Sequence, residues 1–146
     1  MTLTGSLRTR LGLALLTATL ATVAAGCGKK ETPLYPVTGK VFINGKPAEH
    51  ATVVFHPVGA APDAVKPRAT VGPDGTFKLT SVSAGDGAAA GDYAVTVEWW
   101  LSPVNRGDPD GPPVNFLAAK FGKPETSGLK AQVQTAPTDL ATIELK

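Results

Sequence analysis

Apolar and polar residues alternate along the chain from Val37 onward, a pattern that predicts β-strands. The longest run lies between Tyr93 and Trp99, where every second side chain is apolar and large. Period-two alternation over seven residues is typical of a strand with one face in a core. Seven such runs are present, and their predicted core-facing residues are Val37, Gly39, Val41, Ile43; Ala51, Val53, Phe55; Ala69, Val71; Phe77, Leu79; Tyr93, Val95, Val97, Trp99; Leu129, Ala131, Val133; and Ala141, Ile143, Leu145.

Turn-forming residues separate these runs. Asn44-Gly45 is a strong signal for a two-residue hairpin, because both residues tolerate positive φ, and Pro57 should end the strand before it. The segment GPDG, residues 72–75, predicts a tight turn that pairs its two flanking strands as a hairpin. The long excursion 101–127 contains VNFLAAKF, whose spacing predicts a short helix over 114–121. Together, these elements indicate an all-β, antiparallel β-sandwich of about seven strands.

The pattern is different before Val37. Residues 1–10 are polar and include Arg8 and Arg10, and residues 11–26 are uncharged and largely apolar. This run of 16 residues is short for a membrane-spanning helix, which needs about 20. A basic start, a short apolar middle and an end of small residues predict a helical secretory signal peptide.

The only cysteine of the chain, Cys27, follows Ala24, Ala25 and Gly26 directly. A single cysteine excludes an internal disulfide and a cysteine-cluster metal site. The segment resembles the lipobox of bacterial lipoproteins, although Ala24 stands where that family most often has Leu. The resemblance implies cleavage between Gly26 and Cys27 and a diacylglycerol thioether on Cys27, with fatty acids such as palmitate as the membrane anchor. A plain secretory signal with an accidental cysteine and an uncleaved anchor helix are the alternatives.

The sequence therefore predicts three segments: a signal peptide at 1–26, a flexible tether at 27–36 and a β-sandwich domain at 37–146. The tether is polar and contains two lysines and two prolines, so it should be extended. A lipid-anchored chain of this kind belongs to the cell envelope, on the outer membrane or on the periplasmic face of a membrane. Gly28, rather than Asp, follows Cys27, which by analogy with the sorting rule of enteric bacteria favours the outer membrane.

Several short motifs of the domain occur in a recognisable order. They are Gly39, Gly45-Lys46-Pro47 and Ala51; then Thr70, Asp74-Gly75 and Phe77; then Gly91 and Tyr93. Between Val37 and Trp99 the chain resembles the carboxypeptidase regulatory-like domain, a transthyretin-like (prealbumin-like) sandwich. The resemblance implies an accessory module that aids folding or binding and does not catalyse a reaction.

The charge of the chain gives no support for nucleic-acid binding. The formal net charge is +2, and Arg8 and Arg10 supply that excess. Without the signal peptide the domain is balanced and has no basic stripe, so a polyanion would be attracted only weakly.

Candidate catalytic and metal-binding residues are few. His50 and His56 lie at the two ends of one predicted strand, about 20 Å apart, and cannot share a metal ion. No nucleophile elbow is recognisable, so we expect no catalytic residue, metal or cofactor; a small hydrolase, which would need a histidine beside a carboxylate, is the least favoured alternative. Asp108 and Asp110 are expected in a solvated turn rather than a calcium site, and the tripeptide Arg106-Gly107-Asp108 is interpreted as a chance match to an adhesion motif.

The pair Trp99-Trp100 is the candidate binding surface. If Trp99 faces the core, Trp100 must face outward, where it could stack on a sugar ring or anchor a protein partner. We expect instead that the 101–127 excursion covers Trp100 with Phe116 and Phe121. The sequence as a whole predicts a lipid-anchored, non-catalytic envelope module with a structural or protein-binding role. The alternative is a carbohydrate-binding module that uses Trp100; the partner would be an envelope protein or a polysaccharide.

Overall fold

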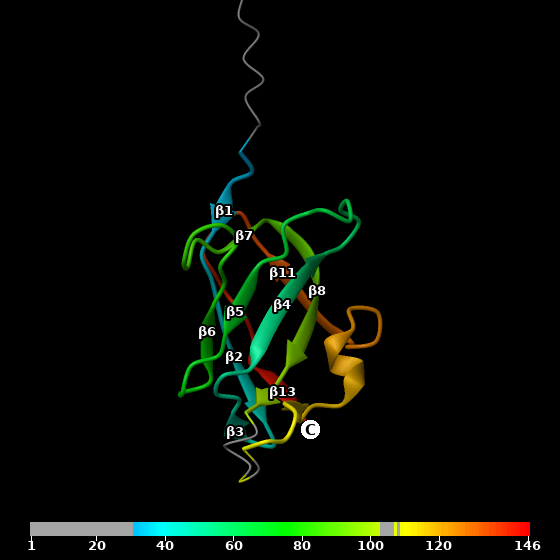
Figure 1. Cartoon of the computed structure of the whole chain (residues 1–146). Coiled ribbons are helices and arrows are strands. Elements are labelled where there is room, and N and C mark those ends of the chain that lie inside the picture. The colour runs from blue at the N-terminus through cyan, green and yellow to red at the C-terminus, as the bar shows by residue number, and fades with distance from the viewer. Residues whose placement is uncertain (1–30, 103–106, 108) are drawn as a thin grey trace, which may run out of the picture. The chain divides into compact units, whose positions relative to one another are not determined.

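The structure, a computed structural model, describes residues 31–102, 107 and 109–146. The residues from Glu31 to Lys146 form one compact unit whose regular elements are nearly all short strands (Figure 1). The elements are β1 (Leu34–Tyr35), β2 (Val37–Ile43), β3 (Lys46–Pro47), β4 (Thr52–Pro57), β5 (Arg68–Thr70), β6 (Thr76–Lys78), β7 (Ala88–Ala89), β8 (Gly91–Glu98), β9 (Trp100–Leu101), β10 (Val114–Asn115), the 3-10 helix η2 (Ala119–Gly122), β11 (Leu129–Val133), β12 (Thr138–Asp139) and β13 (Ile143–Leu145).

Two main sheets form the β-sandwich. One has four strands in the order β11-β8-β4-β5, and all of its pairs are antiparallel. The other has five strands, and each of its outer members pairs with β2. There, β3 and β6 are antiparallel to β2, whereas β12 and β13 are parallel to it. The expected all-β sandwich is confirmed, and its second sheet is mixed rather than purely antiparallel.

The core lies between the two sheets, and most of the predicted inward residues are buried. Phe55 from the four-stranded sheet is at its centre. Its ring centroid lies 6.3 Å from that of Phe77 in the five-stranded sheet and 5.7 Å from that of Tyr93. Tilted rings at these distances give favourable edge contacts as well as buried area. The alternation of the sequence therefore identified the residues by which the two sheets contact each other.

The hairpin predicted across the turn at 72–75 is wrong, although the turn itself forms. β5 pairs with β4 and β6 pairs with β2, so the turn carries the chain from one sheet to the other. Only the isolated bridge between Arg68 and Thr80 joins the two runs. Because the chain crosses between the sheets, Ala69 and Phe77 cover the core from opposite sheets. A hairpin within one sheet would place both residues in the same sheet.

Three smaller expectations also differ from the structure. The helix predicted over 114–121 is limited to η2, because Val114–Asn115 form β10 and pair with β9. Ala141, expected in the core, is exposed. Thr96, which alternates with the predicted core residues Val95 and Val97 and so belongs to the opposite face, is nevertheless buried and hydrogen-bonded to His56.

The chain enters the domain at one end of the sandwich, here called the entry end. Leu34 and Tyr35, predicted as part of the flexible tether, form β1, which pairs with β7. β8 starts directly after β7 and extends over eight residues, about 26 Å. It ends at the opposite end of the sandwich, here called the distal end, where β3 also lies (Figure 1). In the described part of the chain, no helix is long and apolar enough to cross a bilayer.

Candidate functional site

The distal end carries a short ribbon in which β9 pairs with β10. Asn115 lies directly opposite Trp100, and Val114 lies opposite Leu101. Because side chains alternate along a strand and opposite residues share a face, the ribbon has two chemically different faces. One continues the outer face of β8 with Glu98, Trp100 and Asn115. The other continues its core face with Trp99, Leu101, Val114 and Phe116.

Trp99 is held in the structure by contacts on several sides. Its backbone N–H donates to Oδ1 of Asn115 at 3.0 Å, and its Nε1 donates to the carbonyl oxygen of Glu49 at 2.9 Å. Its ring meets that of Phe116 edge-on, with centroids 6.2 Å apart. These contacts assign Trp99 a packing role, so the two neighbouring tryptophans do not form one binding surface.

Trp100 is 52% exposed, and the predicted cover over it does not form. Phe116 packs against Trp99 instead, on the opposite face of the ribbon, and Phe121 is buried in the core cluster. The Nε1 of Trp100 donates to Oε2 of Glu98 at 3.2 Å. This bond fixes the edge of the indole while its ring stays open to solvent.

Two polar residues neighbour Trp100: Glu98 accepts from its indole, and Asn115 lies opposite it on β10. Oδ1 of Asn115 accepts hydrogen bonds from the backbone N–H groups of Trp99 and Leu117. Because these bonds assign the oxygen of the side-chain amide, the remaining polar atom of that amide is the nitrogen Nδ2. Glu98 accepts the hydrogen bond from Trp100 with Oε2 only. Its Oε1 lies beside Gly122, so a Cβ added to Gly122 would be 3.1 Å from this oxygen. No buried side-chain nitrogen or oxygen in the described residues lacks a partner. Oε1 of Glu98 and Nδ2 of Asn115 make no hydrogen bond to another residue within this part of the chain.

The opposite face of the ribbon is apolar. Phe116 is 52% exposed and Val114 is 38% exposed, although both continue the core face of β8. Exposed apolar side chains at one end of a domain are typical of contact surfaces. The distal end thus has a polar face with one open tryptophan and an apolar face with an open phenylalanine.

The two histidines do not meet. His50 lies in a turn before β4 with φ of 67°, and its Nε2 is 3.4 Å from Oε1 of Glu49. His56 lies near the other end of β4, where its Nε2 is 3.0 Å from Oγ1 of Thr96. Burial lowers the pKa of His56, Lys66 lowers it further, and Glu125 opposes the shift. His56 is therefore biased toward its neutral form, as expected for a structural histidine.

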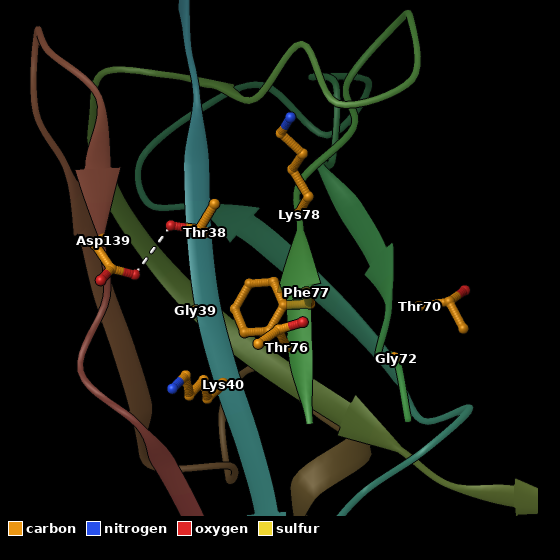
Figure 2. Close-up of a pocket in the computed structure, with 9 residues that line it drawn as sticks. All are labelled: Thr38, Gly39, Lys40, Thr70, Gly72, Thr76, Phe77, Lys78 and Asp139. Atoms are coloured by element: carbon orange, nitrogen blue, oxygen red, sulfur yellow. Dashed lines mark hydrogen bonds between the residues drawn. The ribbon is translucent and has the colours of Figure 1, made fainter. Parts of the chain in front are cut away.

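A shallow depression of about 540 Å³ lies on the five-stranded sheet (Figure 2). The ammonium groups of Lys40 and Lys78 and the hydroxyl groups of three threonines surround it. Thr38 donates to Oδ1 of Asp139 at 2.9 Å, so the carboxylate is already paired across the sheet. This open polar surface brings together neither a nucleophile and a base nor a set of metal ligands.

The remaining sequence-based site predictions fall mostly outside the described residues. Gly26, Cys27 and the rest of the signal peptide lie there, as do Arg106 and Asp108. Asp110 is exposed in a turn. Within the residues that the structure does describe, no three His, Cys, Asp or Glu side chains are grouped closely enough to hold a metal ion.

Comparison with known proteins identifies no family for this chain. No protein-family profile and no curated protein matches it. Among solved structures, a 9R-lipoxygenase from Cyanothece PCC8801 aligns with 16% identity and a TM-score of 0.39. The alignment covers 77% of this chain and 16% of the lipoxygenase chain. A likeness this low carries no argument about activity.

Proposed function

We propose that this protein is a lipid-anchored, non-catalytic module of the cell envelope with a structural or protein-binding role. The observation that carries the proposal is the order of the parts. A lipobox-like segment ending at Cys27 precedes a compact domain that starts at Glu31. The chain enters that domain at one end, and exposed aromatic side chains lie at the other.

The order of the signal segment and the domain determines which end of the domain lies nearer the membrane in a tethered protein. An acylated Cys27 holds the entry end toward the membrane, because only a few residues separate it from β1. The distal end is then directed away from that membrane by the length of the sandwich. A protein partner would dock on the apolar face of the ribbon, with Val114 and Phe116 as anchors, since aromatic side chains contribute strongly to protein contacts.

Carbohydrate binding is the second candidate function. The observation that favours it is the exposure of Trp100 beside the polar side chains of Glu98 and Asn115. Trp100 and Phe116 lie on opposite faces of the ribbon, so substitutions can separate the two candidates.

Metabolic labelling with an alkyne fatty acid tests the anchor. We expect the wild-type chain to be labelled and to sediment with membranes, and Cys27→Ala to be unlabelled. Lys29→Ala is the matched control, since it alters the tether and leaves the cysteine in place. Labelling of Cys27→Ala at the wild-type level would overturn the proposed anchor.

Cross-linking in intact cells tests the protein-binding role. We expect a discrete cross-linked species that disappears in Phe116→Ala and persists in Val82→Ala, which shortens another exposed apolar side chain far from the ribbon in sequence. Persistence of that species in Phe116→Ala would exclude the apolar face as the docking surface.

A further inference from the structure

We propose that Glu98, Trp100 and Asn115 form a binding site for a neutral sugar ring at the distal end. The inference rests on the second candidate function and deepens it by naming the residues and the class of ligand. These three residues are called the Trp100 site below. They come from β8, β9 and β10 and lie on one face of the ribbon.

The indole of Trp100 supplies an apolar platform. A pyranose ring presents a face of C–H groups, which packs against an aromatic ring and leaves the hydroxyl groups at its rim. The hydrogen bond from Nε1 to Glu98 restrains the indole before any ligand arrives. A restrained side chain loses less conformational entropy on binding, so the platform is preorganised.

The two neighbouring side chains supply the polar contacts that a sugar rim requires. Oε1 of Glu98 and Nδ2 of Asn115 make no hydrogen bond to another described residue, so a ligand could use the first as an acceptor and the second as a donor. A hydroxyl group both donates and accepts, so one acceptor and one donor beside a platform suit neighbouring hydroxyl groups. A few placed polar groups around an apolar surface are the usual basis of orientation in small-ligand sites.

The charge of the site limits the ligand class. The only ionisable group in the Trp100 site is the Glu98 carboxylate, which would repel a uronic acid or a phosphorylated glycan. The bond from Trp100 keeps this carboxylate next to the platform. A neutral glycan fits this arrangement better than an acidic one.

Backbone contacts support the geometry of the site. Asn115 reaches its position because two backbone N–H groups hold its Oδ1. Gly122 leaves room for the Glu98 carboxylate, because a Cβ there would come within 3.1 Å of Oε1. Both features hold the two side chains in place without any ligand, Glu98 against the indole of Trp100 and Asn115 opposite Trp100 on β10.

Calorimetric titration of the full chain in detergent tests the proposal. The probes are tetrasaccharides of β-1,4-linked glucose and of β-1,4-linked N-acetylglucosamine, added up to millimolar concentration. We expect saturable binding of at least one probe, and at least about tenfold weaker binding by Trp100→Ala. Binding should change little with salt, because the ligand is neutral.

Matched variants make the test specific to this site. Asn115→Asp keeps the Oδ1 acceptor and removes the Nδ2 donor, and Glu98→Gln keeps an acceptor for Trp100 and removes the charge. Each should weaken binding by several-fold. Phe116→Leu, on the other face, should bind as the wild type does.

Three results would overturn the proposal: no heat with either probe, binding by Trp100→Ala equal to wild type, or an equal loss in Phe116→Leu. The last result would indicate an apolar docking surface for a protein. Cys27→Ser carries the Trp100 site unchanged and should bind the sugar as the wild type does. Failure of the lipid anchor and failure of the sugar site therefore give different results.

Discussion

The entry end and the distal end of the sandwich are built in different ways. At the entry end, β1 lies against β7, and polar side chains and backbone groups satisfy one another. Asp86 accepts from the backbone N–H groups of Ser81, Val82 and Ser83, and Ser81 donates to the carbonyl oxygen of Gly87. At the distal end, the ribbon leaves Trp100 and Phe116 half exposed. The entry end is closed by specific bonds and exposes only aliphatic side chains such as Val58 and Val82, whereas the distal end exposes two aromatic rings.

This difference distinguishes the entry end, which maintains the fold, from the distal end, which can bind a ligand or a partner. Changes at the entry end should lower the free energy of unfolding, because they break contacts that exist only in the native state. Changes of exposed distal side chains should have a small effect on folding and a large effect on binding. Three predictions, from the largest expected effect on stability to the smallest, test the comparison.

Gly87→Ala should have the largest effect. Gly87 has a φ of 90°, and a Cβ there would overlap the carbonyl oxygen of Tyr35. We expect a loss of about 3 kcal/mol or more in the free energy of unfolding, measured by urea denaturation.

Gly45→Ala is the matched control for this prediction. Gly45 also has a positive φ, 75°, but a Cβ there would meet no atom within 4 Å. It should lose only about 1 kcal/mol, the cost of the left-handed backbone. Equal losses in the two variants would show that the contact between β1 and β7 adds nothing to stability.

Asp86→Asn should have an intermediate effect on the free energy of unfolding, and the size of that effect should depend on pH. The hydrogen bonds from Ser83, Ser81 and Val82 hold the pKa of Asp86 below its ordinary value of 3.8. A lowered pKa means that the folded state binds the proton less tightly than the unfolded state does. The stabilisation is therefore complete above pH 3.8 and is lost as the pH falls through the lower pKa of the folded state.

Thermal unfolding between neutral pH and pH 2 measures this effect. Wild type should lose stability on acidification, and Asp86→Asn should lose less, because it lacks the titrating group. The hydrogen bonds with Thr76 lower the pKa of Asp74 in the same way, so Asp74 should retain part of the acid dependence in the variant. An identical acid dependence in the two proteins would contradict the role assigned to Asp86.

Substitutions on the ribbon should have the smallest effects on stability. Phe116→Ala removes the edge contact with Trp99 and should cost about 1 kcal/mol. Trp100→Ala removes an exposed side chain and should stay within about 0.5 kcal/mol of wild type. Urea denaturation of both variants measures this order. A loss from Trp100→Ala larger than that from Phe116→Ala would mean that Trp100 is part of the packing rather than of a binding surface.

Much of the fold could be predicted from the sequence, because the two faces of a strand differ directly in their residues. The alternation in β2, β4 and β8 identified the core positions, and Asn44-Gly45 identified the turn after β2, where both residues have positive φ. The strand that pairs across this turn, β3, was not predicted, and the predicted run at 51–55 lies in the other sheet. Strand pairing could not be predicted in the same way. The turn at 72–75 is compatible with a hairpin and with a crossover between sheets, and only burial of both apolar faces selects the crossover.

Only part of the candidate site could be predicted, because the rest depends on strand pairing. Side chains alternate along a strand, so Glu98 and Trp100, which are two residues apart, lie on the same face. The alternation thus predicts that Trp100 points outward. The position of Asn115 opposite Trp100 depends on a pairing across the loop 102–113, which local pattern does not encode. The sequence alone determined the longer strands and most of their buried faces. The lipoprotein signal that ends at Cys27 stays a prediction. Only the tertiary structure decided which strands pair and that Trp100 stays uncovered, because both depend on contacts between residues far apart in the chain.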